Sequence, residues 1–186
     1  MKVGILALQG AFAEHKEMCR RLGAECVELR KKDDLNMHYD ALILPGGEST
    51  VQGKLLKELD MFETLKKQIE SGIPTLATCA GMILLAEKID NDDRTYFQTM
   101  PIVVHRNAYG RQLGSFCFDG EFKGIGKVPM TFIRAPYITR VSDEAEILAT
   151  VDNHTVAARY KNQIALSFHP ELNEDLSIHK MFLDSI

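Results

Sequence analysis

The sequence is poor in the features that mark membrane proteins and nucleic-acid-binding proteins. None of its apolar runs approaches the roughly 18 residues that a membrane-spanning helix requires, so we expect no membrane partner. The 22 Lys and Arg residues are outnumbered by 26 Asp and Glu residues, and the formal net charge is -4. Because nucleic-acid binders normally carry a basic patch, and the sequence has no long basic run, we expect no nucleic-acid partner.

Signs of secretion and of disulfide or metal cross-linking are also missing. The N-terminal segment turns polar by Glu14 and lacks the long apolar stretch and the cleavage site of a signal peptide. The cysteines are not spaced as in a disulfide framework or a zinc site; they are Cys19, Cys26, Cys79 and Cys117. Most histidines show no metal-ligand spacing, which predicts no bound metal; these are His15, His38, His105, His154 and His179. We therefore expect a reduced, cytoplasmic protein.

The first half of the sequence alternates short apolar runs with amphipathic segments. The apolar runs predict strands at residues 3–8, 26–29, 39–44 and 73–77, and a later run predicts one at 163–168. Helices are expected at residues 13–22, at 81–88 and from 174 onward. A further long helix should begin at Ser49, with capping-box spacing to Gln52, continue through Ile69 and end before Gly72. This alternation predicts parallel strands with right-handed crossovers.

The character of the chain changes at about residue 90. Short, turn-separated apolar runs at residues 100–104, 115–118, 130–133, 146–149 and 155–160 predict hairpins added to the parallel core. With 186 residues, no internal repeat and no linker, we expect one domain over residues 1–186. The predicted fold class is α/β: a three-layer, open, mostly parallel sheet with flanking helices and added antiparallel hairpins.

Cys79 is the first candidate for chemistry. The small residues Ala77 and Gly81 lie two positions before and after it, as a tight strand–nucleophile–helix elbow requires. At such an elbow the sulfur would lie at a helix N-terminus, where the helix dipole favours a thiolate. Cysteine is also among the residues most often buried for packing alone. The local sequence leaves these two interpretations balanced.

A glycine-containing loop, PGGEST at residues 45–50, follows a different predicted strand. Glycines let the backbone turn its N–H groups toward a ligand, so the loop could form an oxyanion hole. An ordinary turn leading into a helix cap is an equally good interpretation of this segment alone. A phosphate loop is excluded, because no Lys-Ser or Lys-Thr pair follows the glycines.

His169 and Glu171 form the third candidate. A histidine that ends an apolar strand, with a carboxylate two residues later, could supply a general base and the group that orients it. A lone histidine in this position is more often structural. The position of this segment favours the catalytic interpretation. In an open α/β sheet, ligands bind at the carboxyl ends of the strands, and three segments follow predicted strands there: residues 45–49, 79 and 169–171. A thiol, an imidazole and a carboxylate that meet there form a triad arrangement.

Two other glycine-containing segments do not fit known nucleotide motifs. Residues 120–127 lack the glycine and the Ser or Thr that a Walker loop requires, and they predict a hairpin connection. Residues 9–11 lack the remaining glycines of a dinucleotide-binding fingerprint.

Taken together, these motifs resemble class I glutamine amidotransferases and, within them, the glutaminase subunits of pyridoxal 5′-phosphate synthase. The general class is indicated by the PGG loop, the Cys-x-Gly elbow and the His-Pro-Glu segment. The narrower resemblance rests on six blocks in the family's order: ALQG (7–10), PGGEST (45–50), TCAG (78–81), RNAYGRQ (106–112), FIRAP (132–136) and HPEL (169–172). The resemblance implies a flavodoxin-like core and no cofactor.

The resemblance also implies a mechanism. Cys79 would attack the side-chain amide of L-glutamine to give a thioester and ammonia, His169 would shuttle the proton, and Glu171 would orient the imidazole. Backbone N–H groups of Gly47 and Ala80 would form the oxyanion hole. The implied glutamine contacts are Gly47, Glu48, Ser49, Arg106, Ile133 and Arg134.

The implied partner is the synthase subunit, which would receive the ammonia and, in this family, switches the glutaminase on. Residues 90–105 depart from the family pattern, so the resemblance implies no particular local structure or partner contacts for this segment. Three alternatives stay open: the glutaminase subunit of another amidotransferase, a stand-alone amidase or peptidase, and a catalytically silent binding subunit. The intact Cys79, His169 and Glu171 argue against the last.

Overall fold

The computed structural model of the chain describes residues 1–107 and 115–186. The parallel half of its sheet contains β1 (Lys2–Leu6), β2 (Glu25–Leu29), β3 (Ala41–Leu44), β4 (Thr75–Thr78) and β12 (Gln163–Leu166). The second half contains β5 (Ala86–Ile89), β6 (Met100–His105), β9 (Tyr137–Val141), β10 (Glu146–Val151) and β11 (His154–Tyr160). A separate hairpin is formed by β7 (Ser115–Phe122) and β8 (Gly126–Ile133). The helices are α1 (Phe12–Arg21), α2 (Ser49–Glu58), α3 (Phe62–Glu70), α4 (Ala80–Leu85) and α5 (Ser177–Asp184), with short 3-10 turns at Lys32–Asn36 and Pro170–Leu172.

Ten of the described strands form one sheet, in the order β2-β1-β3-β4-β12-β11-β9-β6-β5, with β10 paired to β11 off this path. Strands β2, β1, β3, β4 and β12 pair in parallel, which confirms the predicted parallel core. All five strands predicted for it are present, with ends that differ by at most two residues from the expected ones.

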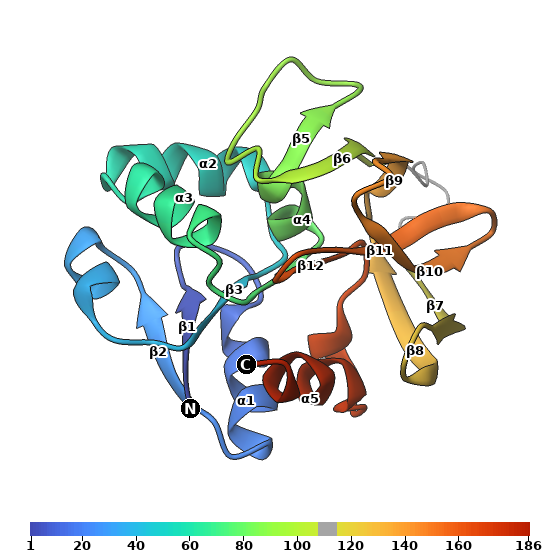
Figure 1. The fold of residues 1–186 in the computed structure, drawn as a ribbon, viewed down its shortest axis with the longest axis horizontal. Helices are drawn as coiled ribbons and strands as arrows, with labels where there is room; N and C mark the ends of the chain where they lie inside the picture. The colour runs from blue at the N-terminus through green and yellow to red at the C-terminus, as the bar shows by residue number, and fades with distance from the viewer. Residues whose placement is uncertain (108–114) are drawn as a thin grey trace.

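Two apolar cores lie on opposite faces of the parallel strands. Leu42 and Leu44 of β3 belong to the core that α2, α3 and α4 cover, whereas Ala41 and Ile43 belong to the core that α1 and α5 cover. Figure 1 shows α2 and α3 on one side of the sheet and α1 and α5 side by side on the other. Every residue of β3, β4 and β12 is buried, because both faces of these strands are covered.

The prediction of one long helix after Ser49 is wrong. Helix α2 ends at Glu58, and α3 begins at Phe62. Asp60 between them has a φ of 52°, in the left-handed region that no α-helix continues through. The apolar spacing runs across the break without a change, so it could not reveal the interruption. That spacing comprises Leu55, Leu59, Phe62, Leu65 and Ile69. Leu59, at the break, is 37% exposed.

The predicted capping box is also absent. Glu48 is the N-cap residue of α2 and makes no side-chain capping bond. The Gln52 side chain instead donates to the carbonyl oxygens of Gln9 at 3.0 Å and Pro45 at 3.1 Å. Gln52 therefore ties together the loops that follow β1 and β3, rather than closing the helix end.

The helix predicted for residues 81–88 is shorter than expected. Helix α4 ends at Leu85, and the following residues form β5, which pairs in parallel with β6. Tertiary pairing overrides the helical tendency of these residues. Strand β9 was not expected either; it pairs with β11 on one side and β6 on the other, and so links β6 and β5 to the rest of the sheet. The predicted hairpins are confirmed for β7–β8 and β10–β11.

The fold places four loops at one edge of the sheet. Strands β1, β3, β4 and β12 run parallel, so the segments at residues 9–10, 45–48, 79 and 167–171 meet at their carboxyl ends. Within the part of the chain that the structure describes, no helix is long and apolar enough to cross a bilayer.

Candidate active site

Cys79 lies at a sharp turn between β4 and α4. It is the N-cap residue of α4, and its backbone angles are φ 47° and ψ -101°. Its N–H donates to Leu166 O at 2.7 Å, which anchors the turn to β12. A Cβ atom on Gly81 would lie 2.1 Å from Leu44 O, and Ala77 is fully buried, so the small residues around the cysteine are needed. The structure thus has a tight strand–turn–helix elbow at Cys79, which is the geometry that the nucleophile interpretation requires.

His169 and Glu171 lie beside this elbow. The His169 Nδ1 atom is 2.7 Å from Glu171 Oε1, and both side chains are buried. Burial lowers the pKa of His169, but hydrogen bonds to Cys79 and Glu171, and the charge of Glu171, outweigh burial and raise the pKa to about 10. Burial raises the pKa of Glu171, but His15 and His169 beside it bring the pKa below its usual value. The site therefore favours an imidazolium held between the sulfur and an ionised carboxylate.

Gly46 packs directly against the imidazole. A Cβ atom on Gly46 would lie 2.3 Å from the Cε1 atom of His169, so only glycine fits here. The Gly46 N–H donates to Thr78 Oγ1 at 2.9 Å, and its carbonyl accepts from the Ala11 N–H at 3.1 Å. The first glycine of the loop is therefore fixed from both sides.

The peptide that follows Gly46 carries the N–H group that is predicted to be an oxyanion donor. Because the peptide is trans and its carbonyl oxygen faces Ala11, the N–H of Gly47 points away from Ala11. The next N–H, that of Glu48, is already used, since it donates to Gln9 Oε1 at 2.8 Å. The Gln9 side chain thus holds the loop in place, and the Glu48 N–H is not free to bind a ligand.

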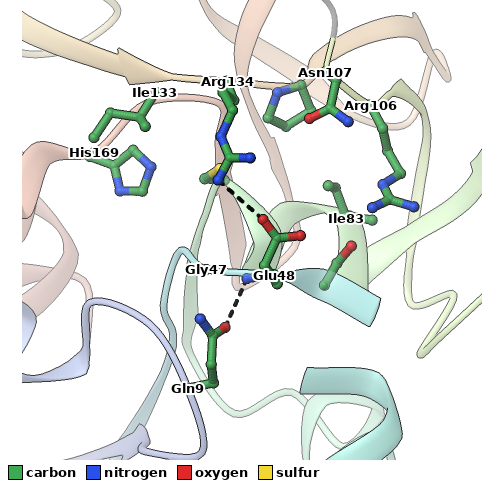
Figure 2. Close-up of a pocket in the computed structure, with 12 residues that line it drawn as sticks. Gln9, Gly47, Glu48, Ile83, Arg106, Asn107, Ile133, Arg134 and His169 are labelled. Carbon is green, nitrogen blue, oxygen red and sulfur yellow. Dashed lines mark hydrogen bonds and ion pairs between the residues drawn. The ribbon is translucent and has the colours of Figure 1, made fainter. Parts of the chain in front are cut away.

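A cavity of about 180 Å³ lies at this site, and Figure 2 shows the residues that line it. Its lining includes Cys79, His169 and all six predicted glutamine contacts: Gly47, Glu48, Ser49, Arg106, Ile133 and Arg134. Two predicted site residues do not line it. Glu171 contacts the Nδ1 side of His169, and Ala80 is 1% exposed. The backbone N–H of Ala80 begins α4 and is one of the groups that lack a partner inside a helix.

The two arginines of the pocket are each paired with an acid. Arg134 Nη2 lies 3.3 Å from Glu48 Oε1, and Arg106 Nη1 lies 2.5 Å from Asp92 Oδ2. Hydrogen bonds from Arg94 and Arg106 hold the pKa of Asp92 well below its usual range. Asp92 comes from the 90–105 segment that departs from the family pattern, so this segment contributes to the pocket through Arg106.

The structure adds pocket residues to which sequence analysis gave no role. These are Gln9, Ile83, Asn107 and Pro136. Gln9 follows β1 at the same sheet edge as the other loops, and Ile83 lies one helical turn after Cys79, so both positions carried a signal. Residues 108–112 of the RNAYGRQ block lie outside the described residues. No three His, Cys, Asp or Glu side chains among residues 1–107 and 115–186 form a metal-binding cluster.

Comparison with known proteins gives a consistent picture. A family model described as the SNO glutamine amidotransferase family matches residues 5–186. A protein of Desulfitobacterium hafniense (strain DSM 10664 / DCB-2) is 62% identical over 186 residues, which cover 100% of this chain and 94% of that protein. One of Haemophilus influenzae (strain PittGG) is 58% identical over 187 residues, with 99% and 97% covered. Both are named pyridoxal 5′-phosphate synthase subunit PdxT.

Solved structures agree with this picture. One described as "Crystal structure of glutamine amidotransferase" superposes with a TM-score of 0.92 at 44% identity, covering 98% of this chain and 97% of the other. The structure of PurLQS from Thermotoga maritima superposes with a TM-score of 0.71 at 15% identity, covering 99% and 98%. The second likeness shows a shared fold.

Proposed function

The chain belongs to the SNO glutamine amidotransferase family, and from this premise we propose that Cys79, His169 and Glu171 are its catalytic triad. The chain is the glutaminase component of a pyridoxal 5′-phosphate synthase and releases ammonia from L-glutamine, as relatives 54–62% identical over its length support. The observation that carries the residue assignment is that Cys79 and His169 line the same pocket, while the other side of the imidazole, Nδ1, lies 2.7 Å from the buried Glu171 Oε1.

The proposed reaction has two halves. The Cys79 sulfur attacks the amide carbon of the glutamine side chain, and His169 gives its proton to the leaving nitrogen, so that ammonia departs and a γ-glutamyl thioester remains. His169 then takes a proton from water, which attacks the thioester and releases L-glutamate. Glu171 keeps the imidazole in the required orientation throughout. N–H groups of Gly47 and Ala80 stabilise the oxyanion in both halves.

The lining of the pocket suits the polar ends of glutamine. The guanidinium groups of Arg106 and Arg134 match an α-carboxylate, and Glu48 can accept from an α-ammonium group. Ser49 adds a hydroxyl that is fully buried and has no hydrogen-bond partner among the described residues. A buried hydroxyl without a partner is costly, which supports its use by a bound substrate.

We propose that the ammonia passes to a synthase subunit with which the chain forms a hetero-oligomer. Free ammonia is mostly protonated at neutral pH and is then no nucleophile, so direct transfer preserves its reactivity. The proposal places the complex in the cytoplasm, where Cys79 would stay a free thiol, as it is in the structure.

A glutaminase assay with and without the synthase subunit tests this proposal. We expect hydrolysis of glutamine by the assembled complex, little hydrolysis by the chain alone, and none by a complex that carries Cys79→Ala. Cys117→Ala, which removes an exposed cysteine far along the chain, is the matched control and should keep its activity. Full activity of Cys79→Ala would overturn the triad.

The same assay separates the remaining alternatives. A stand-alone amidase would be fully active without a partner and would accept amides other than glutamine. A silent binding subunit would hydrolyse nothing, and a glutamine-directed electrophile would fail to label Cys79 in the complex.

A further inference from the structure

His15 is a buried histidine that the proposed reaction does not use. It lies on α1, and no part of it is exposed. Its Nε2 atom is 3.1 Å from Thr78 Oγ1 and 3.4 Å from Glu171 Oε2. Its Nδ1 atom is 2.9 Å from the Nε2 atom of His179. A pair of imidazoles, separate from that of His169, therefore lies behind the carboxylate of the triad.

The pair comes from two helices at opposite ends of the chain. Figure 1 shows α1 and α5 side by side beneath the sheet, and their imidazole rings are 5.1 Å apart between centroids. Burial lowers the pKa of His15, and burial lowers that of His179 to about 3. Each ring is therefore neutral near pH 7 and carries a single N–H.

Geometry decides which nitrogen carries each proton. Glu171 Oε2 forms no hydrogen bond of standard geometry within the described residues, and a bare His15 Nε2 at 3.4 Å would face it with a lone pair. A proton on His15 Nε2 instead points at Thr78 Oγ1 and Glu171 Oε2. His15 Nδ1 then accepts from the Nε2–H of His179. His179 Nδ1, which has no partner there, is left as a bare acceptor, and an unpaired acceptor is tolerated better than a buried unpaired N–H.

We propose that His15, backed by His179, is a positioning residue of this glutaminase: its Nε2–H holds the free oxygen of Glu171 and, through Thr78, the Gly46 turn beside the nucleophile. The inference rests on the proposed function, because it assigns a role in the same reaction. Thr78 is the link to the loop, since its Oγ1 also accepts from the Gly46 N–H at 2.9 Å. His15 thus contacts both Glu171, which orients the proposed base, and Thr78, which holds the loop of the proposed oxyanion hole.

The role predicts a pH effect through the groups that act on this pair. Neighbouring titratable groups affect the pKa of each member of this cluster. Glu171, His169 and Glu14 affect the pKa of His15, and His15 and His169 affect that of Glu171. His15 and Glu171 affect the pKa of His179. Without the His15 donor, Glu171 would take up a proton at a higher pH. The imidazolium of His169 would then lose its counter-ion, so the acidic limb of activity should move to higher pH.

Two substitutions of His15 make a matched test. The amide nitrogen of His15→Gln reaches about as far as Nε2 and keeps the donor near Glu171, whereas that of His15→Asn reaches only as far as Nδ1. We expect His15→Asn to move the acidic limb of kcat/KM upward by about one pH unit, which is the size expected for one lost hydrogen bond to a carboxylate. His15→Gln should restore most of this shift. Met18→Ala, a buried position of the same helix, should lower thermal stability and leave the limb in place.

The pH dependence of Cys79 alkylation by iodoacetamide, followed on the peptide that contains Cys79, gives a second readout. It needs only the chain itself, so His15→Asn and His15→Gln can be compared without the synthase. If His15→Asn does not fold, His179→Phe keeps the test open, because it leaves His15 in place and should shift the limb in the same direction by less.

The outcomes separate this inference from the proposed function. Wild-type complex without Cys79-dependent glutaminase activity would overturn the function itself. Suppose instead that the wild-type complex is active. If His15→Asn then leaves the acidic limb of activity unchanged, or if His15→Gln and His15→Asn shift it equally, only the role of His15 is overturned. A uniform loss of activity at every pH would mean that His15 only packs.

Discussion

Arg134 and Glu48 face each other across the pocket, with Arg134 Nη2 3.3 Å from Glu48 Oε1 (Figure 2). One follows β8 and the other follows β3, so segments far apart in the sequence supply the two charges. The side chains are 70% and 47% exposed, and such a surface pair contributes only about 0–1 kcal/mol to stability. Its charges are the complements of the α-carboxylate and the α-ammonium group of free glutamine.

Neutralising this pair should weaken substrate binding and leave the fold intact. We expect Glu48→Gln and Arg134→Gln each to raise the KM for glutamine about tenfold, the effect of losing one charge-assisted hydrogen bond. The kcat and the melting temperature should change little. Steady-state kinetics of the assembled complex measure this, with Glu146→Gln as the control, because Glu146 pairs with Lys123 at 2.8 Å in another exposed region. Unchanged KM values in both pocket variants would remove the pair from the glutamine site.

Asp92 should influence glutamine binding without touching the substrate. Its carboxylate is 2.5 Å from Arg106 Nη1 and fixes the direction of that guanidinium. We expect Asp92→Asn to raise the KM for glutamine several-fold, less than Arg106→Ala does, with kcat nearly unchanged. Asp93→Asn, a change to the exposed acid next in the chain, is the matched control. An Asp92→Asn complex with the wild-type KM would show that Arg106 is held by other contacts.

Gly81→Ala should disrupt the elbow. The added Cβ atom would lie 2.1 Å from Leu44 O, a backbone atom that cannot move aside cheaply. We expect a loss of about 1–3 kcal/mol in the free energy of unfolding, together with a large fall in activity as Cys79 shifts. Gly124→Ala is the comparison: its Cβ would meet nothing within 4 Å, but its φ of 86° still costs about 1 kcal/mol. Urea unfolding and steady-state kinetics measure both effects. If Gly81→Ala and Gly124→Ala lost the same stability and the same activity, the clash with Leu44 O would not be the cause.

Sequence reasoning succeeded where the signal is local. Buried strands appear as unbroken apolar runs, and the elbow appears as small residues at fixed distances from Cys79. Because parallel strands end at one edge of a sheet, their order was enough to bring residues 45–49, 79 and 169–171 together.

Sequence reasoning failed where contacts between distant segments determine the local structure. Nothing in the apolar spacing marks the left-handed residue at Asp60, and the pairing of β5 with β6 overrides a helical sequence. The contact between Asp92 and Arg106 depends on how the 90–105 segment folds back. The position of His15 behind Glu171 depends on α1 and α5 packing together, and no spacing in the sequence records that.

The buried histidines should make stability depend on pH in a predictable direction. Burial holds the pKa of His179 at about 3 in the folded state, far below the value near 6.5 of an exposed histidine, and lowers that of His15. The folded state therefore binds fewer protons than the unfolded state below about pH 6.5, and stability falls as the pH drops. His169 acts in the opposite way: its pKa is raised to about 10, so its contribution is full below about pH 6.5 and is lost as the pH rises toward 10. Stability should be greatest near neutral pH.

Substituting His179 isolates one of these contributions. We expect His179→Gln to reduce the acid-side slope of the free energy of unfolding by about 1.4 kcal/mol per pH unit between pH 6 and about pH 4, the value for one proton. Urea unfolding at a series of pH values measures the slope. His38→Gln is the control, because its imidazole is 84% exposed, and it should keep the wild-type slope. If His179→Gln also keeps that slope, His179 takes up its proton in the folded protein, and the neutral, proton-donating ring assigned behind His15 is wrong.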